Sequence, residues 1–116
     1  SRFILRLRTS EMDEQGTPPI QTPEGAVRPG ELQHVAVTFD GHRAVFYVDG
    51  EAVADSTHFG GDMGIGTLQN WDETMHLMLG NEFTGDRFWS GSIRLVAIYA
   101  DALTAEQIQS NFSAGL

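Results

Sequence analysis

Carboxylate and aromatic side chains are the candidates for catalysis and ligand binding in this sequence. Glu11 and Asp13 lie in the run "EMDE", and this spacing places both carboxylates on one face if the run is a strand. Glycoside hydrolases use such a pair, one carboxylate on each side of the bond that breaks. Gly16 and a pair of prolines follow at once and no apolar alternation surrounds the run. We therefore expect no catalytic residues in this chain.

A loop tryptophan is the first candidate for ligand binding. Trp71 lies between Asn70 and Asp72 in the glycine-rich, polar stretch 55–75, which also contains His58. An aromatic ring beside amide and carboxylate groups is suited to stacking on a sugar ring and bonding its hydroxyls. The alternative is that Trp71 packs back onto its own domain. Both interpretations stay open, and the predicted ligand-binding residues are Trp71, Asn70, Asp72 and His58.

Oxygen-bearing side chains in two loops are candidate metal ligands. Calcium takes about six to eight oxygen ligands from carboxylates, amides, carbonyls and water. Side chains of this kind border the stretch "HLMLGN", and they are Asp62, Asp72, Asn81, Glu82 and Asp86. No EF-hand spacing is present, and the four histidines are scattered. Without cysteine, the chain has no disulfide, no Cys-ligated zinc and no thiol catalysis.

The net charge of the chain restricts the classes of partner that it is expected to bind. The sequence has 116 residues and a net charge of −9, and all of its basic residues except histidine are arginines. Such an acidic surface disfavours nucleic acid and anionic membranes, which are bound by neutralising phosphates. No apolar run approaches the ~18–20 residues that would cross a bilayer. We expect no nucleic-acid partner and no membrane insertion.

Period-2 alternation predicts an antiparallel β-protein. Strands are expected at 3–8, at 34–39, 44–48 and 51–54, and at 76–80 and 92–99, with a short strand near 25–27 inside the long loop 9–31. Asp40-Gly41 and Asp49-Gly50 separate the three strands of the middle group. Asp-Gly is a strong signal for a hairpin turn, so both aspartates are interpreted as corners rather than as chemistry.

The C-terminal segment changes to a helical pattern. Thr104 is expected to be the N-cap and Gln107 the N3 residue of a capping box, with Leu103 packing on Ile108. Gly115 is suited to end the helix. The predicted fold class is an all-β antiparallel sandwich with one short C-terminal helix, in a single domain over residues 1–116.

Four stretches in this order resemble laminin-G-like domains, which have the concanavalin A-like jelly-roll fold: "HVAVTFDG", "FYVDGEAVA", "LMLGN" and "FWSGSIRLVAIYADALTAEQIQSNFSAG". The resemblance covers roughly residues 32–116. It implies that Trp89 lies in the core, and Phe88 beside it is also expected to pack there. Arg94 and Leu95 depart from the pattern, because the family often has acidic residues at these positions.

The resemblance implies a non-catalytic binding or adhesion module of a secreted or cell-surface bacterial protein. The expected ligand is a carbohydrate or an extracellular protein, bound by loops at one rim, and calcium is the expected metal. Family domains also have strands before "FILRLR", so this chain is expected to be a fragment, a minimal sandwich or a half completed by self-association or by a partner chain. Two further alternatives are a fragment of a glycoside hydrolase and a ligand-free spacer.

Overall fold

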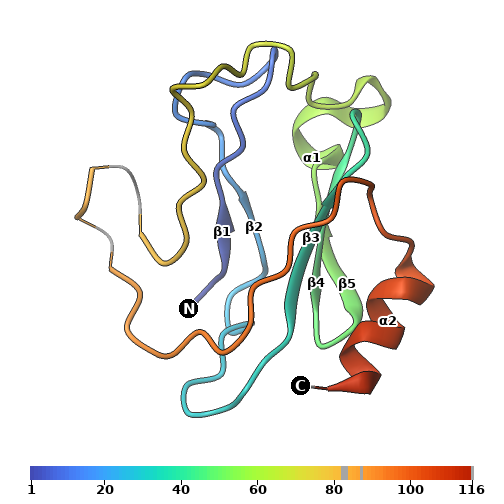
Figure 1. Ribbon diagram of the computed structural model, residues 1–116. Coiled ribbons are helices and arrows are strands. Elements are labelled where there is room, and N and C mark those ends of the chain that lie inside the picture. The colour runs from blue at the N-terminus through green and yellow to red at the C-terminus, as the bar shows by residue number, and fades with distance from the viewer. Residues whose placement is uncertain (82–83, 87, 116) are drawn as a thin grey trace.

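Two antiparallel sheets, one of two strands and one of three, lie side by side in the molecule (Figure 1). The computed structural model describes residues 1–81, 84–86 and 88–115, with residues 59, 60 and 62 described by their backbone only. No helix in these described ranges is long and apolar enough to cross a membrane. The two-sheet architecture with a helix at the C-terminal end confirms the predicted fold class.

The three-stranded sheet is the meander predicted from the sequence. It contains β3 (Val35–Phe39), β4 (Ala44–Val48) and β5 (Glu51–Asp55), in that order. β4 is central, and four of its five residues are buried. A strand that is covered on both faces needs apolar residues at successive positions, which is the pattern that β4 has.

The two Asp-Gly pairs are both corners, as predicted, but they make different turns. Asp49 (φ 51°) and Gly50 (φ 84°) form the two-residue connection between β4 and β5, with the two positive φ angles of a type I′ turn. Residues 40–43 form a longer connection between β3 and β4. There Asp40 Oδ1 accepts hydrogen bonds from the backbone N–H groups of His42 (2.9 Å) and Arg43 (2.7 Å).

The two-stranded sheet is shorter than the sequence predicts. β1 covers only Ile4–Leu5, and it pairs with β2 (Ile20–Gln21), which the sequence pattern did not indicate. The short strand expected near residues 25–27 does not form. The core lies between the two sheets and is built from apolar residues of both and of the segment after β5, namely Phe3, Ile20, Ala44, Phe46, Val48 and Ile65.

The predicted strands at 76–80 and 92–99 are absent, which corrects the prediction from sequence. A strand exists only when its backbone bonds to a neighbouring strand, and alternation alone does not supply that neighbour. The core role expected for Phe88 is also wrong, because its side chain is 79% exposed. Trp89 is 45% exposed and stacks on Phe3, with ring centroids 6.0 Å apart, so it reaches the edge of the core.

The C-terminal helix α2 (Ala105–Ala114) forms as predicted. Thr104 Oγ1 accepts from the Gln107 N–H (3.2 Å), and Gln107 Oε1 accepts from the Thr104 N–H (2.9 Å), which completes the capping box. Ile108 is buried, and Gly115 caps the end of the helix. The sequence pattern missed α1 (Thr57–Gly60) and the 3-10 turn η1 (Gly61–Met63), which follow β5.

Candidate functional site

Residues 65–75, called here the Trp71 loop, are fastened to the segment 8–12 that follows β1. The Thr9 hydroxyl donates to the carbonyl of Ile65, and the N–H of Ser10 donates to the carbonyl of Thr67 (2.9 Å). The N–H of Thr67 in turn donates to Ser10 Oγ (3.0 Å). Thr9 and Ile65 are both buried, so the first residue of the loop is part of the core. The rest of the loop is held in place from this end.

Trp71 and Asn70 are also tied to this segment. The indole Nε1–H of Trp71 donates to the carbonyl of Arg8 at 2.6 Å, and Asn70 Nδ2–H donates to the carbonyl of Thr9 at 3.1 Å. Trp71 nevertheless remains 40% exposed. Its one hydrogen-bond donor is used inside the molecule, so a ligand can meet only the apolar surface of the ring.

Asp72 extends the site with a charged acceptor. Asp72 Oδ1 accepts from both the hydroxyl and the N–H of Thr74, the latter at 2.8 Å. These bonds, the hydroxyl first, hold the pKa of Asp72 below its usual range, so the group is ionised at neutral pH. Within the described part of the chain, Asp72 Oδ2 has no hydrogen-bond donor. It is therefore available to a ligand.

His58, the fourth predicted ligand-binding residue, belongs to a different place. It lies in α1 and lines a depression of about 500 Å³, whose other lining residues are Arg2, Gln21, Thr22, Pro23, Ala54, Asp55 and Thr57. None of them belongs to the Trp71 loop. Asn70 and Trp71 thus share the partner segment 8–12, Asp72 bonds to Thr74, and His58 lies among another set of residues.

A second depression, of about 530 Å³, adjoins the Trp71 loop through Leu68. Its other lining residues come from the turn after β3 and from the segment before α2: Phe39, Asp40, Gly41, Ala100, Asp101 and Ala102. Hydrogen bonds from backbone N–H groups, that of Arg43 first, lower the pKa of Asp40. The sequence pattern showed Asp40 only as a corner, because nothing local reveals that residues 100–102 come beside it.

The structure describes the side chains of three of the five predicted calcium ligands, namely Asp72, Asn81 and Asp86. Glu82 lies outside the described residues, and so does the side chain of Asp62. Asp86 Oδ1 accepts from the hydroxyl of Thr84, much as Asp72 does from Thr74. Across residues 1–81, 84–86 and 88–115, no three His, Cys, Asp or Glu side chains form a group that could hold a metal ion.

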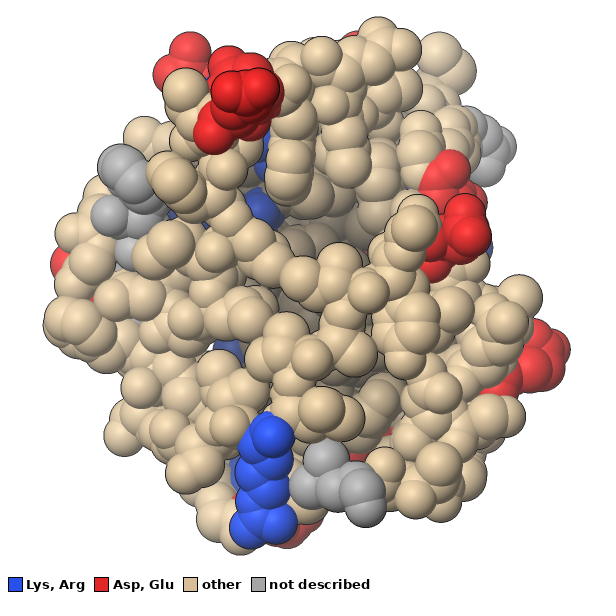
Figure 2. All heavy atoms as spheres, in the orientation of Figure 1, with Lys and Arg blue, Asp and Glu red and all other residues tan. Residues whose placement is uncertain are grey.

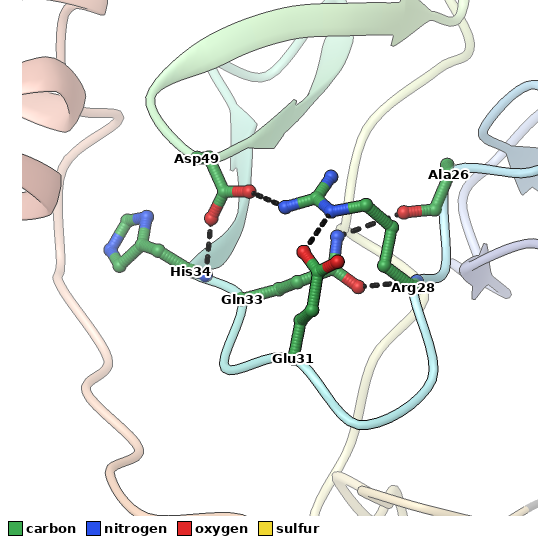
Figure 3. A network of polar contacts seen from close by, with 6 residues as sticks. All are labelled: Ala26, Arg28, Glu31, Gln33, His34 and Asp49. Atoms are coloured by element: carbon green, nitrogen blue, oxygen red, sulfur yellow. Dashed lines mark hydrogen bonds and ion pairs between the residues drawn. The ribbon is translucent and has the colours of Figure 1, made fainter.

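Two other carboxylates are used for structure. Asp13 Oδ1 accepts from the N–H groups of Gln15 (2.9 Å) and Thr17 (2.8 Å), and so caps its own turn. Asp49 accepts from the guanidinium of Arg28 and from the N–H of His34, as Figure 3 shows. Its bonds join the β4–β5 turn to the loop before β3. Asp49 is a structural residue with more partners than a hairpin corner requires.

The comparison with protein families decides what kind of domain carries this site. A family model described as the concanavalin A-like lectin/glucanases superfamily matches residues 5–109. The chain belongs to this superfamily. The superfamily domain therefore includes both sheets, the Trp71 loop and the first part of α2.

Comparisons with individual proteins add little to the superfamily assignment. No curated protein matches the chain. A solved structure of an S-layer domain-containing protein (residues 221–444) from Clostridium thermocellum ATCC 27405 is 24% identical, with a TM-score of 0.49. The match covers 81% of this concanavalin A-like chain and 44% of the S-layer chain, so this chain spans less than half of that one.

Proposed function

We propose that this chain is a non-catalytic binding module of a secreted or cell-surface protein, and that it recognises a carbohydrate through the Trp71 loop. The observation that carries the proposal is the half-exposed ring of Trp71, fixed by its Nε1–H bond to the Arg8 carbonyl at 2.6 Å. A ring held in one orientation loses little freedom when a ligand stacks on it. The superfamily, which includes lectins, supports this class of ligand.

Carboxylates in the Trp71 loop and in the depression that adjoins it suit hydroxyl-rich ligands. The ionised Asp72 keeps an oxygen without a donor among the described residues, and Asp40 and Asp101 line the depression that shares Leu68 with the loop. Carboxylates accept hydrogen bonds from sugar hydroxyls, and the apolar C–H face of a sugar packs on an aromatic ring. An ionised acceptor next to a ring therefore favours a neutral sugar over an acidic one.

Binding to an array of neutral glycans by the purified chain tests the proposal. Trp71→Ala should abolish retention, whereas Trp71→Phe keeps a ring and should retain most of it. The second variant is needed because both changes remove the bond to Arg8, and only the first removes the stacking surface. Asp72→Asn should weaken binding less than Trp71→Ala does. If no glycan binds, or if Trp71→Ala binds as well as the unchanged chain, the proposal is wrong.

The Trp71 variants, together with variants of Glu11 and Asp13, separate the binding module from a spacer and from a glycoside hydrolase. A ligand-free spacer would show no binding that responds to Trp71. A glycoside hydrolase would release product from a glycan and lose this turnover on Glu11→Gln or Asp13→Asn. Asp13 already accepts two backbone N–H groups, which is the role of a turn cap, so we favour the binding module.

Calcium stays a prediction at this site. Asp72, Asn81 and Asp86 would be the described ligands, and Asp62 and Glu82 complete the predicted set. Thermal unfolding in calcium and in EDTA is the measurement, since an ion that binds only the folded state raises the melting temperature. A higher melting temperature in calcium that Asp72→Asn removes supports the site, and equal melting temperatures in both exclude it.

A further inference from the structure

The segment 92–99 has the pattern of an inner strand but is uncovered on both faces. Ile93, Leu95 and Tyr99 alternate with Val96 and Ile98 along the chain. The exposed fractions of their side chains are 53%, 67%, 56%, 50% and 75%, in that order. A strand that is apolar on both faces is normally buried on both. An exposed apolar stretch of this kind marks a surface that associates.

The backbone of this segment is also available. The backbone groups of residues 92–98 make no hydrogen bond with any residue that the structure describes. A row of free N–H and C=O groups with apolar side chains is a template for another strand. The occupant that satisfies both the backbone and the side chains is therefore an extended strand with apolar residues at successive positions.

The charge distribution permits the occupant to be a second copy of the chain. The net charge of −9 would drive copies apart if acidic groups lay on this segment, but its only charged residue is Arg94. The 92–99 segment runs across the view of Figure 1, and the same face in Figure 2 is mostly uncharged, with acidic groups toward its edge and a basic side chain in its lower part. The segment meets its own copy without placing like charges opposite each other.

We propose that two copies of this chain associate by antiparallel pairing of their 92–99 segments around a two-fold axis. Such an axis requires a residue to face itself, and a register centred on Val96 pairs residues 93–99 of one copy with the same residues of the other. Leu95 then faces Ala97, Ile93 faces Tyr99, and Arg94 faces Ile98. Every opposing pair is apolar except the last, in which the arginine stem can cover Ile98 while its charge stays in water.

Light scattering on the purified chain tests the association. The monomer has a mass of 12.7 kDa, and we expect a species of twice this mass that dissociates on dilution. Val96→Glu places two carboxylates opposite each other at the axis and should give monomers at every concentration. Leu32→Glu is the matched control, because Leu32 is 61% exposed and lies outside the segment, and it should leave the dimer intact.

A crosslink tests the register independently of stability. The chain has no cysteine, so Val96→Cys introduces a single thiol at the axis. Residues that face each other across antiparallel strands have Cα atoms about 4.5–5.5 Å apart, within the range of a disulfide. Mild oxidation should link Val96→Cys into a dimer and leave Leu32→Cys largely unlinked. A chain that is monomeric throughout, or a dimer that survives Val96→Glu, overturns the proposal. If the chain is monomeric, a strand of another protein becomes the candidate partner of the segment.

Discussion

Asp49 and His34 bond to each other twice. The backbone N–H of Asp49 donates to the carbonyl of His34 (2.8 Å), and the backbone N–H of His34 donates to Asp49 Oδ1 (2.9 Å). These bonds close the end of the β3–β4 hairpin opposite its turn. The other carboxylate oxygen of Asp49 accepts from Arg28, which also pairs with Glu31. One side chain thus connects a turn, a hairpin end and the preceding loop (Figure 3).

Replacing Asp49 should therefore lower the free energy of unfolding by more than replacing an ordinary acidic residue on the surface. Asp49→Ala removes the side-chain acceptor of the His34 N–H, leaves the Arg28 guanidinium with Glu31 alone and puts alanine at a positive φ, so we expect a loss of about 2 kcal/mol in the free energy of unfolding. Asp49→Asn keeps an acceptor and tolerates this φ, and should lose about half as much. Urea unfolding measures both. Glu51→Ala, at an exposed neighbour, should stay within about 0.5 kcal/mol of the unchanged chain.

Stability should fall in acid, and Asp49 should contribute to the fall. The pKa of Asp49 is raised by burial but lowered more by the bonds from Arg28 and His34, so it lies below its ordinary value. The pKa of Asp40 and that of Asp55 are lowered too, by the Arg43 N–H and the Thr57 hydroxyl first.

A lowered pKa means that the unfolded chain takes up protons before the folded one does. The stabilisation is therefore complete above the unfolded value of about 3.9 and is lost as pH falls through the folded value. Unfolding free energies measured from neutral pH into acid should converge for the unchanged chain and Asp49→Asn. Parallel curves would show that Asp49 has the same pKa in both states.

Position 50 requires glycine for two reasons, because its φ is positive and because α2 lies against it. A Cβ at this position would lie 2.7 Å from Gln109 Oε1 and 3.0 Å from Phe112 Cδ1, both on α2. Gly41 has a similar φ (+89° against +84°) but nothing within 4 Å of its Cβ position. Gly41→Ala should cost about 1–2 kcal/mol from backbone strain alone. Gly50→Ala should cost about 1–3 kcal/mol more, and equal losses would mean that α2 moves aside freely.

The capping box should hold the start of α2. Thr104→Ala removes the acceptor of the Gln107 N–H and should lower the free energy of unfolding by about 1 kcal/mol. Thr104→Ser keeps the hydroxyl and should restore most of it. Amide hydrogen exchange at Gln107 reports the same change locally. Unaltered exchange in Thr104→Ala would show that packing of Ile108, not the cap, fixes the helix start.

The elements predicted well from the sequence are those whose causes are local. The type I′ turn at Asp49-Gly50 and the capping box of Thr104 and Gln107 depend on residues close together in the chain. A short apolar run predicts the strand at 76–80 and alternation predicts the strand at 92–99, but neither pattern indicates whether a neighbouring strand exists. β2 was missed because two residues beside prolines give no periodicity.

In the candidate site, too, the sequence predicts what depends on neighbouring residues and misses what depends on distant ones. Trp71, Asn70 and Asp72 are consecutive in the sequence, so a local pattern is enough to group them. The bond from Trp71 to Arg8 joins residues 63 positions apart, and no pattern within either segment indicates it. The depression formed by residues 39–41, Leu68 and 100–102 was missed for this reason. His58 was grouped with Trp71 only because both lie in one loop of the sequence.

The fastening of the Trp71 loop has a consequence for the order in which the chain folds. The three-stranded sheet lies within residues 35–55 and rests on local contacts, which form early. The bond from Thr9 to Ile65 spans 56 residues, so the Thr9 hydroxyl cannot make it until the loop has been made. On a chain leaving the ribosome, we expect the central sheet to form before the proposed binding surface. Slow synthesis after residue 55 would therefore prolong a state that is folded at its centre and still lacks the ordered Trp71 loop.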